Sequence, residues 1–246
     1  MRDALRWRKI YPRAVKAEKD FAMLQPGDRI LVAVSGGADS LVLLDVLAYQ
    51  HKKIGKTLGL EVVPAHVPGT YRGKPTTDAG RLGRLCRELG FELRLSGAGL
   101  SDGVFSDCFR CSQARRRLLF DLAEEHRCGK IALGHNADDL VETFLLNAFY
   151  SGRLAALSPR QPVLRGKLCF IRPLAYAWKD DIDLYARQRF GRLPGFKCPG
   201  SGNSRRLAVR RLLARLSRGN PHLRGNLLKA VCNPRLEYLP VPSRRL

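Results

Sequence analysis

The stretch at residues 30–47 constrains the fold of this chain more than any other. It reads I-L-V-A-V-S-G-G-A-D-S-L-V-L-L-D-V-L. The first five residues form an apolar, β-branched run of strand length, and residues 35–37 interrupt it. Leu43, Leu44 and Leu47 then recur at helical spacing. A strand, a glycine turn and a helix in this order predict an α/β domain with an anion site at the turn.

The turn itself has the residues of a phosphate-binding loop. Gly36 and Gly37 let the backbone approach a phosphate without an intervening Cβ, and Ser35 and Ser40 add hydroxyl donors. Free N–H groups at the start of the following helix carry a partial positive charge that favours an anion. Asp39 does not bind phosphate directly, so it indicates a bound Mg²⁺ ion or a cap on the loop.

Two commoner phosphate-binding motifs are absent from the sequence. The G-K-T at residues 55–57 matches the end of a Walker A motif, but Gln50 stands where the first glycine belongs. The G-A-G at residues 97–99 lacks the third glycine of a dinucleotide fingerprint. Neither stretch is therefore expected to bind a nucleotide.

The remaining pattern, S-G-G-x-D-S directly after a strand, resembles the PP-loop of the ATP-pyrophosphatase superfamily. Members of that superfamily split ATP between its α- and β-phosphates and adenylylate a substrate. The resemblance implies ATP and Mg²⁺ as cofactors. The alternative is an ordinary glycine turn, which the periodicity on both flanks disfavours.

Further strands and helices alternate along the chain. Expected strands are residues 30–34, 60–67, 91–95, 130–133 and 168–173. Expected helices include residues 1–25, 40–47, 78–89, 179–189 and 205–218, and two more end near residues 126 and 150. This alternation predicts an α/β fold: an open parallel five-stranded sheet with helices on both faces and a basic helical C-terminal extension.

We divide the chain into three parts on this basis. Residues 1–27 are a basic N-terminal helical segment, and residues 28–190 are the ATP-binding catalytic domain. Residues 191–246 contain a cysteine loop and the basic helical region.

The carboxyl ends of two expected strands carry candidate nucleotide contacts, because ligands bind beyond these ends in open parallel sheets. Adenine is expected against residues 65–67, among them Ala65 and His66. For His66, packing or a backbone contact is the favoured alternative. Gly134 and His135 follow a later strand and are expected near the nucleotide as well.

Two acids follow in the same run, G-H-N-A-D-D. Asp138 or Asp139 could bind Mg²⁺ or transfer a proton, since the carboxyl end of a parallel strand is where substrates bind. The alternative is a helix N-cap, and one of the two is expected to take that role.

A second chemical motif is the C-x-x-C at the start of the helix that ends near residue 126. Cys108 and Cys111 share a face of its first turn, and Arg115 follows on that face. The helix N-terminus and the arginine would stabilise thiolates there. The pair fits a metal or iron–sulfur site, but a redox pair, half a zinc site or two structural cysteines remain alternatives.

The balance of charge points to a polyanionic partner. Lys and Arg number 44 against 22 Asp and Glu, which gives a net charge of +22 and a pI of about 10.4. Nucleic acid is the simplest such partner. A basic proteome or a solubility effect is the alternative.

The expected helix at residues 205–218 concentrates this charge. Arg211, Arg215 and Arg218 share one face, and Arg206 and Arg210 share another. A basic helix without acidic partners would bind a phosphate backbone. A merely solvated surface is the alternative.

Apolar runs and cysteine content indicate the cellular compartment. No apolar run reaches 18 residues, and the charged N-terminus lacks the apolar core of a signal peptide, so we expect a cytoplasmic protein without a membrane span. Seven cysteines, an odd number, argue against a disulfide framework.

Taken together, the motifs resemble one family. Their order is S-G-G-x-D-S, then C-x-x-C followed by S-x-x-R-R, then the run A-L-G-H-N-A-D-D-L-V-E-T-F-L-L-N-A-F-Y-S-G-R-L, then I-R-P-L-A-Y and a late lone cysteine before a basic helix. This order is similar to that of the TtcA-type tRNA 2-thiocytidine synthetases, close relatives of the tRNA 2-thiouridine synthetases. The similarity spans residues 28–233, and residues 108–154 are its most distinctive part.

The resemblance implies a set of roles. Residues 35–40 would bind the ATP phosphates, and Cys108, Cys111 and Cys198 would hold a [4Fe–4S] cluster with one iron open to sulfur. Arg115 or Arg116, and Asp138 or Asp139, match positions expected at the active centre. The substrate would be an anticodon-loop cytidine of tRNA, whose C2 oxygen is adenylylated and then replaced by sulfur. A cysteine desulfurase or sulfide would donate the sulfur, and a homodimer is a family expectation.

Two residues depart from the pattern. Ala38 precedes Asp39 where thiolating relatives usually have lysine, so a cation is missing near the phosphates unless a neighbouring Arg or Lys substitutes. Cys198 stands alone where many relatives have a second cysteine nearby. Two alternatives remain: a PP-loop ligase or amidase of the lysidine-synthetase kind, and a non-catalytic RNA-binding derivative.

Overall fold

The structure is a computed structural model that describes residues 4–106, 108–195 and 205–240, without the side chains of residues 4–6, 106, 108 and 236. Tertiary contacts divide the chain into two compact units. The sheet unit comprises Met1–Ala137 and Ser158–Ser204, and the helical unit comprises Asp138–Leu157 and Arg205–Leu246. This division follows contacts in space, whereas the boundaries at residues 27 and 190 came from the linear sequence and stay a prediction.

The sheet unit is built on a six-stranded sheet with the order β5-β2-β1-β6-β8-β7. Its strands are β1 (Arg29–Ala33), β2 (Glu61–His66), β5 (Arg94–Leu95), β6 (Lys130–Ala132), β7 (Arg160–Val163) and β8 (Leu168–Ile171). Five of them pair in parallel, and β7 pairs antiparallel with β8 at one edge. The α/β class is confirmed, and the predicted number of five strands was wrong.

The missed strand, β7, has a physical explanation. Its sequence R-Q-P-V contains a proline and lacks a β-branched run. Proline has no N–H to donate, so it is tolerated at a sheet edge and argues against a strand when the sequence is read alone. A separate two-stranded hairpin, β3 (Thr70–Tyr71) and β4 (Lys74–Pro75), lies between two expected elements, in a segment for which no strand was expected.

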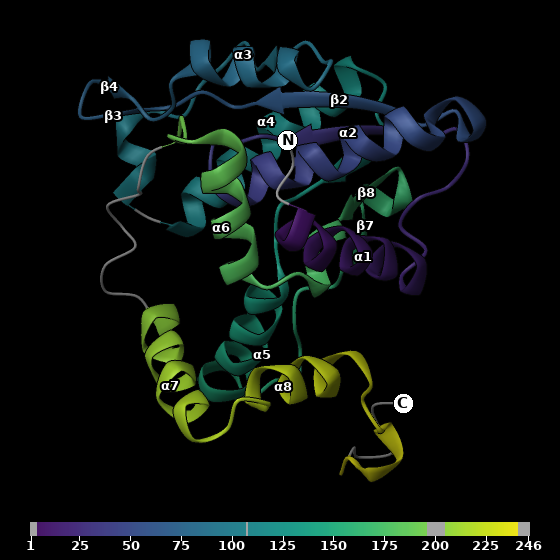
Figure 1. The fold of residues 1–246 in the computed structure, drawn as a ribbon. Coiled ribbons are helices and arrows are strands. Elements are labelled where there is room, and N and C mark those ends of the chain that lie inside the picture. The colour runs from purple at the N-terminus through teal and green to yellow at the C-terminus, as the bar shows by residue number, and fades with distance from the viewer. Residues whose placement is uncertain (1–3, 107, 196–204, 241–246) are drawn as a thin grey trace. The chain divides into compact units, whose positions relative to one another are not determined.

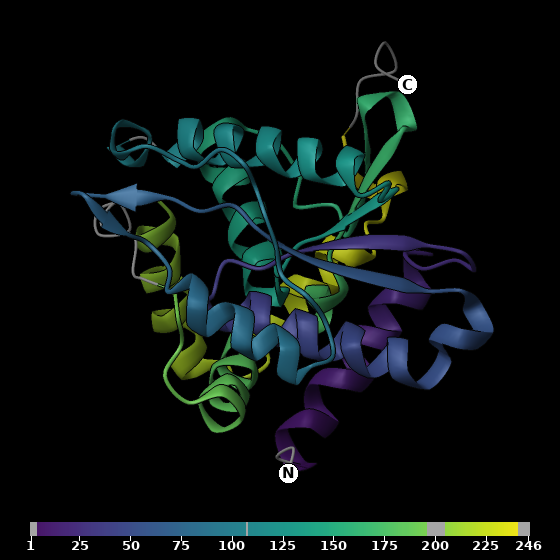
Figure 2. The ribbon, with the colours of Figure 1, turned by 90° about the horizontal axis from the view of Figure 1, so that it is seen from above.

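Helices cover both faces of the sheet, as predicted (Figures 1 and 2). They are α1 (Ala4–Asp20), α2 (Ala38–Leu58), α3 (Ala79–Glu88), α4 (Cys108–Glu125) and α6 (Lys179–Phe190), and short 3₁₀ turns lie at Asp102–Ser106, Leu164–Gly166 and Pro173–Tyr176. Helix α4 packs on one face, and α1, α2 and α6 lie on the other (Figure 2).

Burial on both faces explains why the residues of β1 after Arg29 are all apolar. Leu31 belongs to the apolar cluster that also contains Leu119 and Leu122 of α4. Ile30 and Val32, which point the other way, are also fully buried. The central strand therefore holds the PP-loop at its carboxyl end on a support that is packed from two sides.

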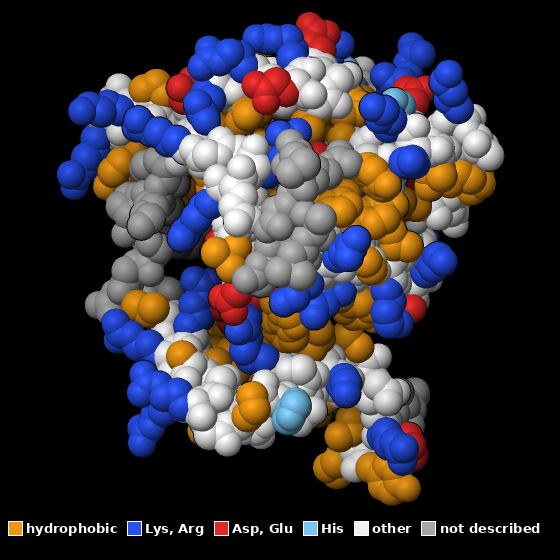
Figure 3. Space-filling model, viewed as in Figure 1, with side chains coloured by type: hydrophobic (Ala, Val, Ile, Leu, Met, Phe, Trp, Pro, Cys, Tyr) orange, Lys and Arg blue, Asp and Glu red, His pale blue; other side chains and the backbone are white. Residues whose placement is uncertain are grey.

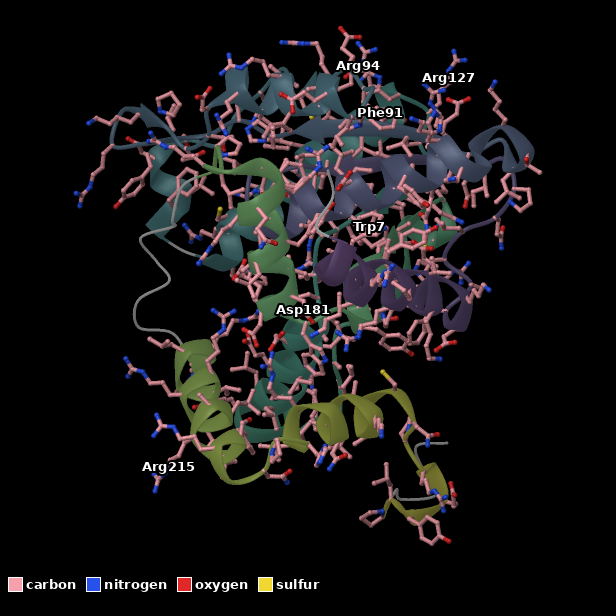
Figure 4. All side chains as sticks on the ribbon, in the orientation of Figure 1. Trp7, Phe91, Arg94, Arg127, Asp181 and Arg215 are labelled. Carbon is pink, nitrogen blue, oxygen red and sulfur yellow. The ribbon has the colours of Figure 1, made fainter. Side chains whose placement is uncertain are left out.

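Helix α1 packs against the rest of the sheet unit through its apolar face. Ile10, Ala14 and Ala17 are fully buried. Asp181 of α6, labelled in Figure 4, accepts a hydrogen bond of 3.1 Å from Arg13. The N-terminal segment is therefore part of the core of this unit.

A buried acid links α1 to α2. Glu18 is 7% exposed, and Gln50 Nε2 donates a hydrogen bond of 2.6 Å to its Oε2. Burial raises the pKa of Glu18 from 4.5 to about 7, although the bond from Gln50 opposes the shift. The folded state therefore binds the proton more tightly than the unfolded state does, and the stability gained from it is lost as pH rises from about 4.5 through 7.

We expect Glu18→Gln to stabilise the protein at pH 8, where the wild type must bury a carboxylate. A pKa raised by this much corresponds to about 3 kcal/mol, or about 10 °C in melting temperature for a chain of this size. At pH 5 the gain should shrink to about 1 kcal/mol or less. Thermal unfolding at both pH values measures the difference, with the exposed Glu124→Gln as the control. Equal gains at pH 5 and pH 8 would contradict this account.

The helical unit consists of α5 (Ala137–Ser151), α7 (Arg205–Gly219) and α8 (Leu223–Cys232), with a 3₁₀ turn at Leu236–Tyr238. Its small core contains Val141, Val209 and Leu213, and Leu223 and Leu227 of α8 pack against it. Helix α8 was not expected from the sequence, because Gly225 and Asn226 are weak helix formers in its first turn. Among the helices of the described ranges, none is long and apolar enough to cross a membrane.

Candidate nucleotide and metal site

The PP-loop lies between β1 and α2 and is tied together by one buried hydroxyl. Ser40 Oγ accepts a hydrogen bond of 3.1 Å from the backbone N–H of Ser35. The same hydroxyl donates a bond of 2.9 Å to the carbonyl of Gly37. Ser35 itself is exposed. The loop is therefore closed by its own last serine, and its first serine remains accessible.

Gly36 lies at the closest approach between two segments. Its φ is +82°, a conformation that residues with a Cβ rarely adopt. The backbone N–H of Gly195 donates a hydrogen bond of 3.0 Å to its carbonyl. A Cβ on Gly36 would lie 2.8 Å from the nitrogen of Gly195. The described segment after α6, which ends at Gly195, is thus anchored to the PP-loop, a contact that nothing in the sequence indicated.

Asp39 is held by two donors from distant parts of the sheet unit. Asn136 Nδ2 donates a bond of 2.9 Å to Asp39 Oδ1, and Lys179 Nζ donates a bond of 2.6 Å to Asp39 Oδ2. Gly134 approaches closely, because a Cβ on it would lie 3.0 Å from the backbone of Asp39. The predicted residues Asp39 and Gly134 therefore meet, and Asn136 and Lys179 join them without having been predicted.

Only one of these missed residues had a sequence signal. Asn136 lies within the G-H-N-A-D-D run, which was singled out for its acids. Lys179 stands 140 residues from Asp39 and belongs to no motif. Its role depends on how α6 packs, which spacing along the chain does not reveal.

His135 is oriented by a fully buried arginine. Arg172 is 1% exposed, and its Nε donates a bond of 3.3 Å to His135 Nδ1. Because Nδ1 accepts this hydrogen bond, the neutral imidazole of His135 carries its proton on Nε2. His135 is half-buried, so this N–H is a hydrogen-bond donor next to Gly134, which itself approaches Asp39 of the PP-loop.

His66 and Ala65 lie at the end of β2. His66 is 4% exposed, and its Nδ1 lies 2.7 Å from the carbonyl of Val34. Burial lowers the pKa of His66, the bond to Val34 opposes that effect, and the charge of Arg115 adds to it. Ala65 is fully buried and packs in the cluster under α4. Adenine contacts at both residues stay a prediction.

The cysteine motif lies on the first turn of α4. Cys111 is half-buried, and Arg115 Nη2 lies 4.0 Å from its Sγ. Cys108 starts the same helix, and the predicted third ligand, Cys198, lies outside the described residues. Arg116 lies over the ring of Phe170 at 6.0 Å. Arg115 and Arg116 are both exposed.

The surroundings of Cys111 fit a thiolate metal ligand. A helix N-terminus and an arginine both favour the ionised form. Burial instead raises the pKa of the Cys86 thiol to about 11 and raises that of Cys128 as well, so these two cysteines are poor ligands. Within the described ranges no group of three His, Cys, Asp or Glu forms a metal site. The cluster assignment therefore stays a prediction supported by the donor chemistry of the α4 pair.

The predicted catalytic acids belong to the helical unit, where they form ion pairs. Asp138 accepts from Arg224, and Asp139 lies 3.0 Å from Arg206 Nη1. Their catalytic role stays a prediction.

Glu142, one turn further along α5, was not predicted at all. It is 3% exposed, and Arg210 Nε donates to it over 2.5 Å. Burial raises the pKa of Glu142, and Arg210 and Arg206 oppose the shift. The expectation that α7 lacks acidic partners was therefore wrong for Arg206 and Arg210, because acids on α5 pair with that face.

The other face of α7 matches the expectation. Arg211, Arg215 and Arg218 are exposed, and no carboxylate within the described ranges pairs with them. Arg215 points away from the helix in Figure 4. Lys and Arg side chains also outnumber the acids on the face shown in Figure 3.

Comparisons with known proteins agree with this geometry. A PP-loop domain family model matches residues 11–192. The chain is 38% identical over 232 residues to a tRNA-cytidine(32) 2-sulfurtransferase of Anaeromyxobacter dehalogenans, covering 91% of this chain and 78% of the relative. It is 34% identical over 246 residues to one of Geobacter sulfurreducens, covering 96% of this chain and 94% of the relative.

The fold has a counterpart among solved structures. The U34-tRNA thiolase NcsA from Methanococcus maripaludis, solved with its [4Fe-4S] cluster, matches with a TM-score of 0.73 at 21% identity, over 95% of this chain and 80% of that one. At this identity the match supports the fold alone. With a PP-loop closed by Ser40 and relatives that match nearly its whole length, the chain belongs to the PP-loop domain family and, within it, to the tRNA-cytidine(32) 2-sulfurtransferases.

Proposed function

We propose that the chain is an ATP-dependent tRNA sulfurtransferase that replaces the C2 oxygen of cytidine 32 by sulfur. The observation that carries the proposal is the closed PP-loop at the carboxyl end of β1, in a chain related over nearly its whole length to tRNA-cytidine(32) 2-sulfurtransferases. The +22 net charge suits a tRNA substrate.

The chemistry requires activation of a poor leaving group. The C2 oxygen attacks the α-phosphate of ATP, the bond between the α- and β-phosphates breaks, and pyrophosphate leaves. Sulfur then attacks C2, and the C2–oxygen bond breaks with AMP as the leaving group. Each step exchanges one bond for another, so no separate oxidant or reductant is needed when sulfur arrives at the sulfide level.

Residues of the sheet unit would bind the phosphates and the Mg²⁺ ion. The N–H groups at the start of α2, with Ser35, Gly36, Gly37 and Ser40, would bind the phosphates. Asp39 would face Mg²⁺, which neutralises the charge on the leaving pyrophosphate. The proton on His135 Nε2 is suited to donate a hydrogen bond to a phosphate oxygen.

Cys108, Cys111 and Cys198 would hold the [4Fe–4S] cluster, which when bound by three thiolates supplies an open coordination position for sulfur. Arg115 and Arg116, exposed on α4, would contact the anionic substrate beside it. Asp138 or Asp139 would assist Mg²⁺ binding or proton transfer, after exchange of its arginine partner. Residues 28–190 would form the catalytic domain, and residues 191–246 would supply the third cysteine and RNA contacts.

The reaction also needs a sulfur donor. Sulfide would donate the sulfur directly, whereas the persulfide of a cysteine desulfurase would first need a two-electron reductant, such as a pair of thiols, to release it as sulfide. The enzyme would act in the cytoplasm, where its tRNA substrate resides. A homodimer belongs to the same proposal.

The test is a complete reaction under anaerobic conditions. The reconstituted protein receives unmodified tRNA, Mg·ATP and sulfide, and digested nucleosides are analysed by mass spectrometry. We expect 2-thiocytidine at position 32, with one AMP and one pyrophosphate released per sulfur. An amino-acid adduct at cytidine would favour a ligase of the lysidine-synthetase kind. RNA binding without ATP turnover would identify a non-catalytic derivative.

The exposed face of α7 makes a separate prediction about tRNA binding. Replacing Arg211, Arg215 and Arg218 by glutamine should weaken binding and reduce the slope of log K against log salt by about 2 to 3, because each lost phosphate contact removes about one unit. Filter binding or fluorescence anisotropy at several salt concentrations measures the slope. The control replaces Arg84, Arg87 and Arg127 of the sheet unit and removes the same charge. Equal slopes for the two triple variants would contradict a specific role for α7.

A further inference from the structure

The PP-loop has no positive charge of its own. Its sequence is S-G-G-A-D-S, and the first turn of α2 contains the acid Asp39 and no base. Ala38 is 7% exposed and offers only a methyl group. A helix N-terminus contributes about half an elementary charge. A bound triphosphate carries several negative charges, of which Mg²⁺ neutralises only a part, so tight binding at this loop calls for a cationic side chain from another part of the chain.

Lys179 places an ammonium group at this loop. Its Nζ lies 2.6 Å from Asp39 Oδ2 and 2.9 Å from Asp183 Oδ1. The side chain is 36% exposed, so the amine is neither buried in the core nor extended into solvent. Asn136 holds the other oxygen of the Asp39 carboxylate. Asp39 is therefore fixed at both oxygens, and it holds the amine beside the loop.

The packing of two helices fixes this arrangement. Lys179 is the first residue of α6, and the PP-loop leads directly into α2. The two helices are joined where Tyr185 donates a hydrogen bond of 2.5 Å to Asp45, which is fully buried. The position of the amine relative to the loop thus depends on a buried contact six residues further along α6.

Local electrostatics alone disfavour a lysine at this position. A cation at a helix N-terminus opposes the helix dipole. A lysine that precedes an aspartate by four residues, as Lys179 precedes Asp183, is the weaker orientation of such a pair. Burial lowers the pKa of Lys179, but Asp39 and Asp183 outweigh burial and raise it, so the amine is charged at neutral pH. A residue that contradicts its local preferences in this way indicates a functional position.

We propose that Lys179 is the cation of the nucleotide site and binds the triphosphate of ATP from α6, in place of a base in the PP-loop itself. Asp39 holds the ammonium near the loop before the nucleotide arrives. The inference rests on the proposed function, since it assumes that the PP-loop binds ATP.

The experiment compares nucleotide affinities of the full-length protein without tRNA, by isothermal titration calorimetry. We expect Lys179→Met to bind Mg·ATP about 10- to 100-fold more weakly, as for loss of a charged hydrogen bond. Adenosine, which has no phosphate, should bind both proteins equally. Lys179→Arg keeps the charge and should retain most of the affinity. Asp183→Asn removes the other partner of the amine and should change ATP affinity by no more than about twofold.

A relocated cation provides the sharpest control. Adding Ala38→Lys to Lys179→Met returns a positive charge to the loop by another route, and the double variant should recover ATP affinity. A merely structural role for Lys179 predicts no recovery, and equal losses for ATP and adenosine.

The outcomes separate the two proposals. If Lys179→Met binds Mg·ATP as tightly as the wild type, or if Lys179→Arg loses as much affinity as Lys179→Met, the inference is wrong while ATP use stands. If the wild type itself does not bind Mg·ATP, the proposed function fails first. The melting temperature of each variant shows whether it folds. If Lys179→Met does not fold, the ATP affinity of Lys179→Arg can still be compared with that of the wild type.

Discussion

Replacing Gly36 by alanine is expected to disable the nucleotide site and to destabilise the sheet unit. The residue has a φ of +82°, and an added Cβ would lie 2.8 Å from the backbone nitrogen of Gly195. A left-handed conformation costs a residue with a Cβ about 1–2 kcal/mol, and the contact with Gly195 adds to that cost. We expect the melting temperature to fall by about 5 °C and ATP affinity to fall at least about tenfold.

Gly37 provides the matched control in the same loop. It has a φ of −82°, and a Cβ there would meet only Ser35 Oγ at 3.6 Å, an ordinary contact. Gly37→Ala should therefore leave the melting temperature of the nucleotide-free protein nearly unchanged. Calorimetry of both variants, with and without Mg·ATP, tests the pair. Equal melting temperatures for the two variants would show that the strain assigned to Gly36 is absent.

Replacing Cys111 by alanine is expected to remove the cluster and sulfur transfer while leaving ATP binding intact. Removing a residue that only hydrogen-bonds to a metal ligand lowers metal affinity by about 10- to 100-fold. Removing a ligand itself should therefore lower the affinity by more. We expect bound iron and sulfide to fall well below about four per chain, and 2-thiocytidine to disappear. ATP affinity should change by no more than about 0.5 kcal/mol, the usual effect of an independent site.

Cys232 is a suitable control for this experiment, because it is half-buried like Cys111 but belongs to α8 in the helical unit. Cys232→Ala should retain iron, sulfide and thiolation. Iron and acid-labile sulfide analysis after anaerobic purification measures both variants. Full cluster content in Cys111→Ala would remove this residue from the ligand set.

The sequence was most informative where a function depends on neighbouring residues. The PP-loop is contiguous, so strand, glycines and helix could be recognised together, and the family assignment that followed was confirmed. The C-x-x-C of α4 was recognisable for the same reason, since residues three apart share a helical face. The alternation of strands and helices likewise predicted the parallel sheet and its two covered faces.

The predictions were weaker where a residue depends on distant partners. Helix α7 was expected to lack acidic partners, yet Glu142 of α5 pairs with Arg210. The edge strand β7 and the helix α8 were missed, because tertiary contacts overrode weak local preferences.

The sequence alone determined that this chain has a PP-loop on a parallel sheet, a cysteine pair at a helix start and an excess of positive charge. Only the tertiary structure decided what completes the loop: Gly195 against Gly36, Asn136 on Asp39, and Lys179 beside Asp39 where Ala38 has no charge. The reason is physical. A motif is defined by spacing along the chain, whereas a hydrogen bond or an ion pair depends on distance in space. Here that distance is set by the packing of α6 against α2 and by the approach of the segment after β6 to the loop.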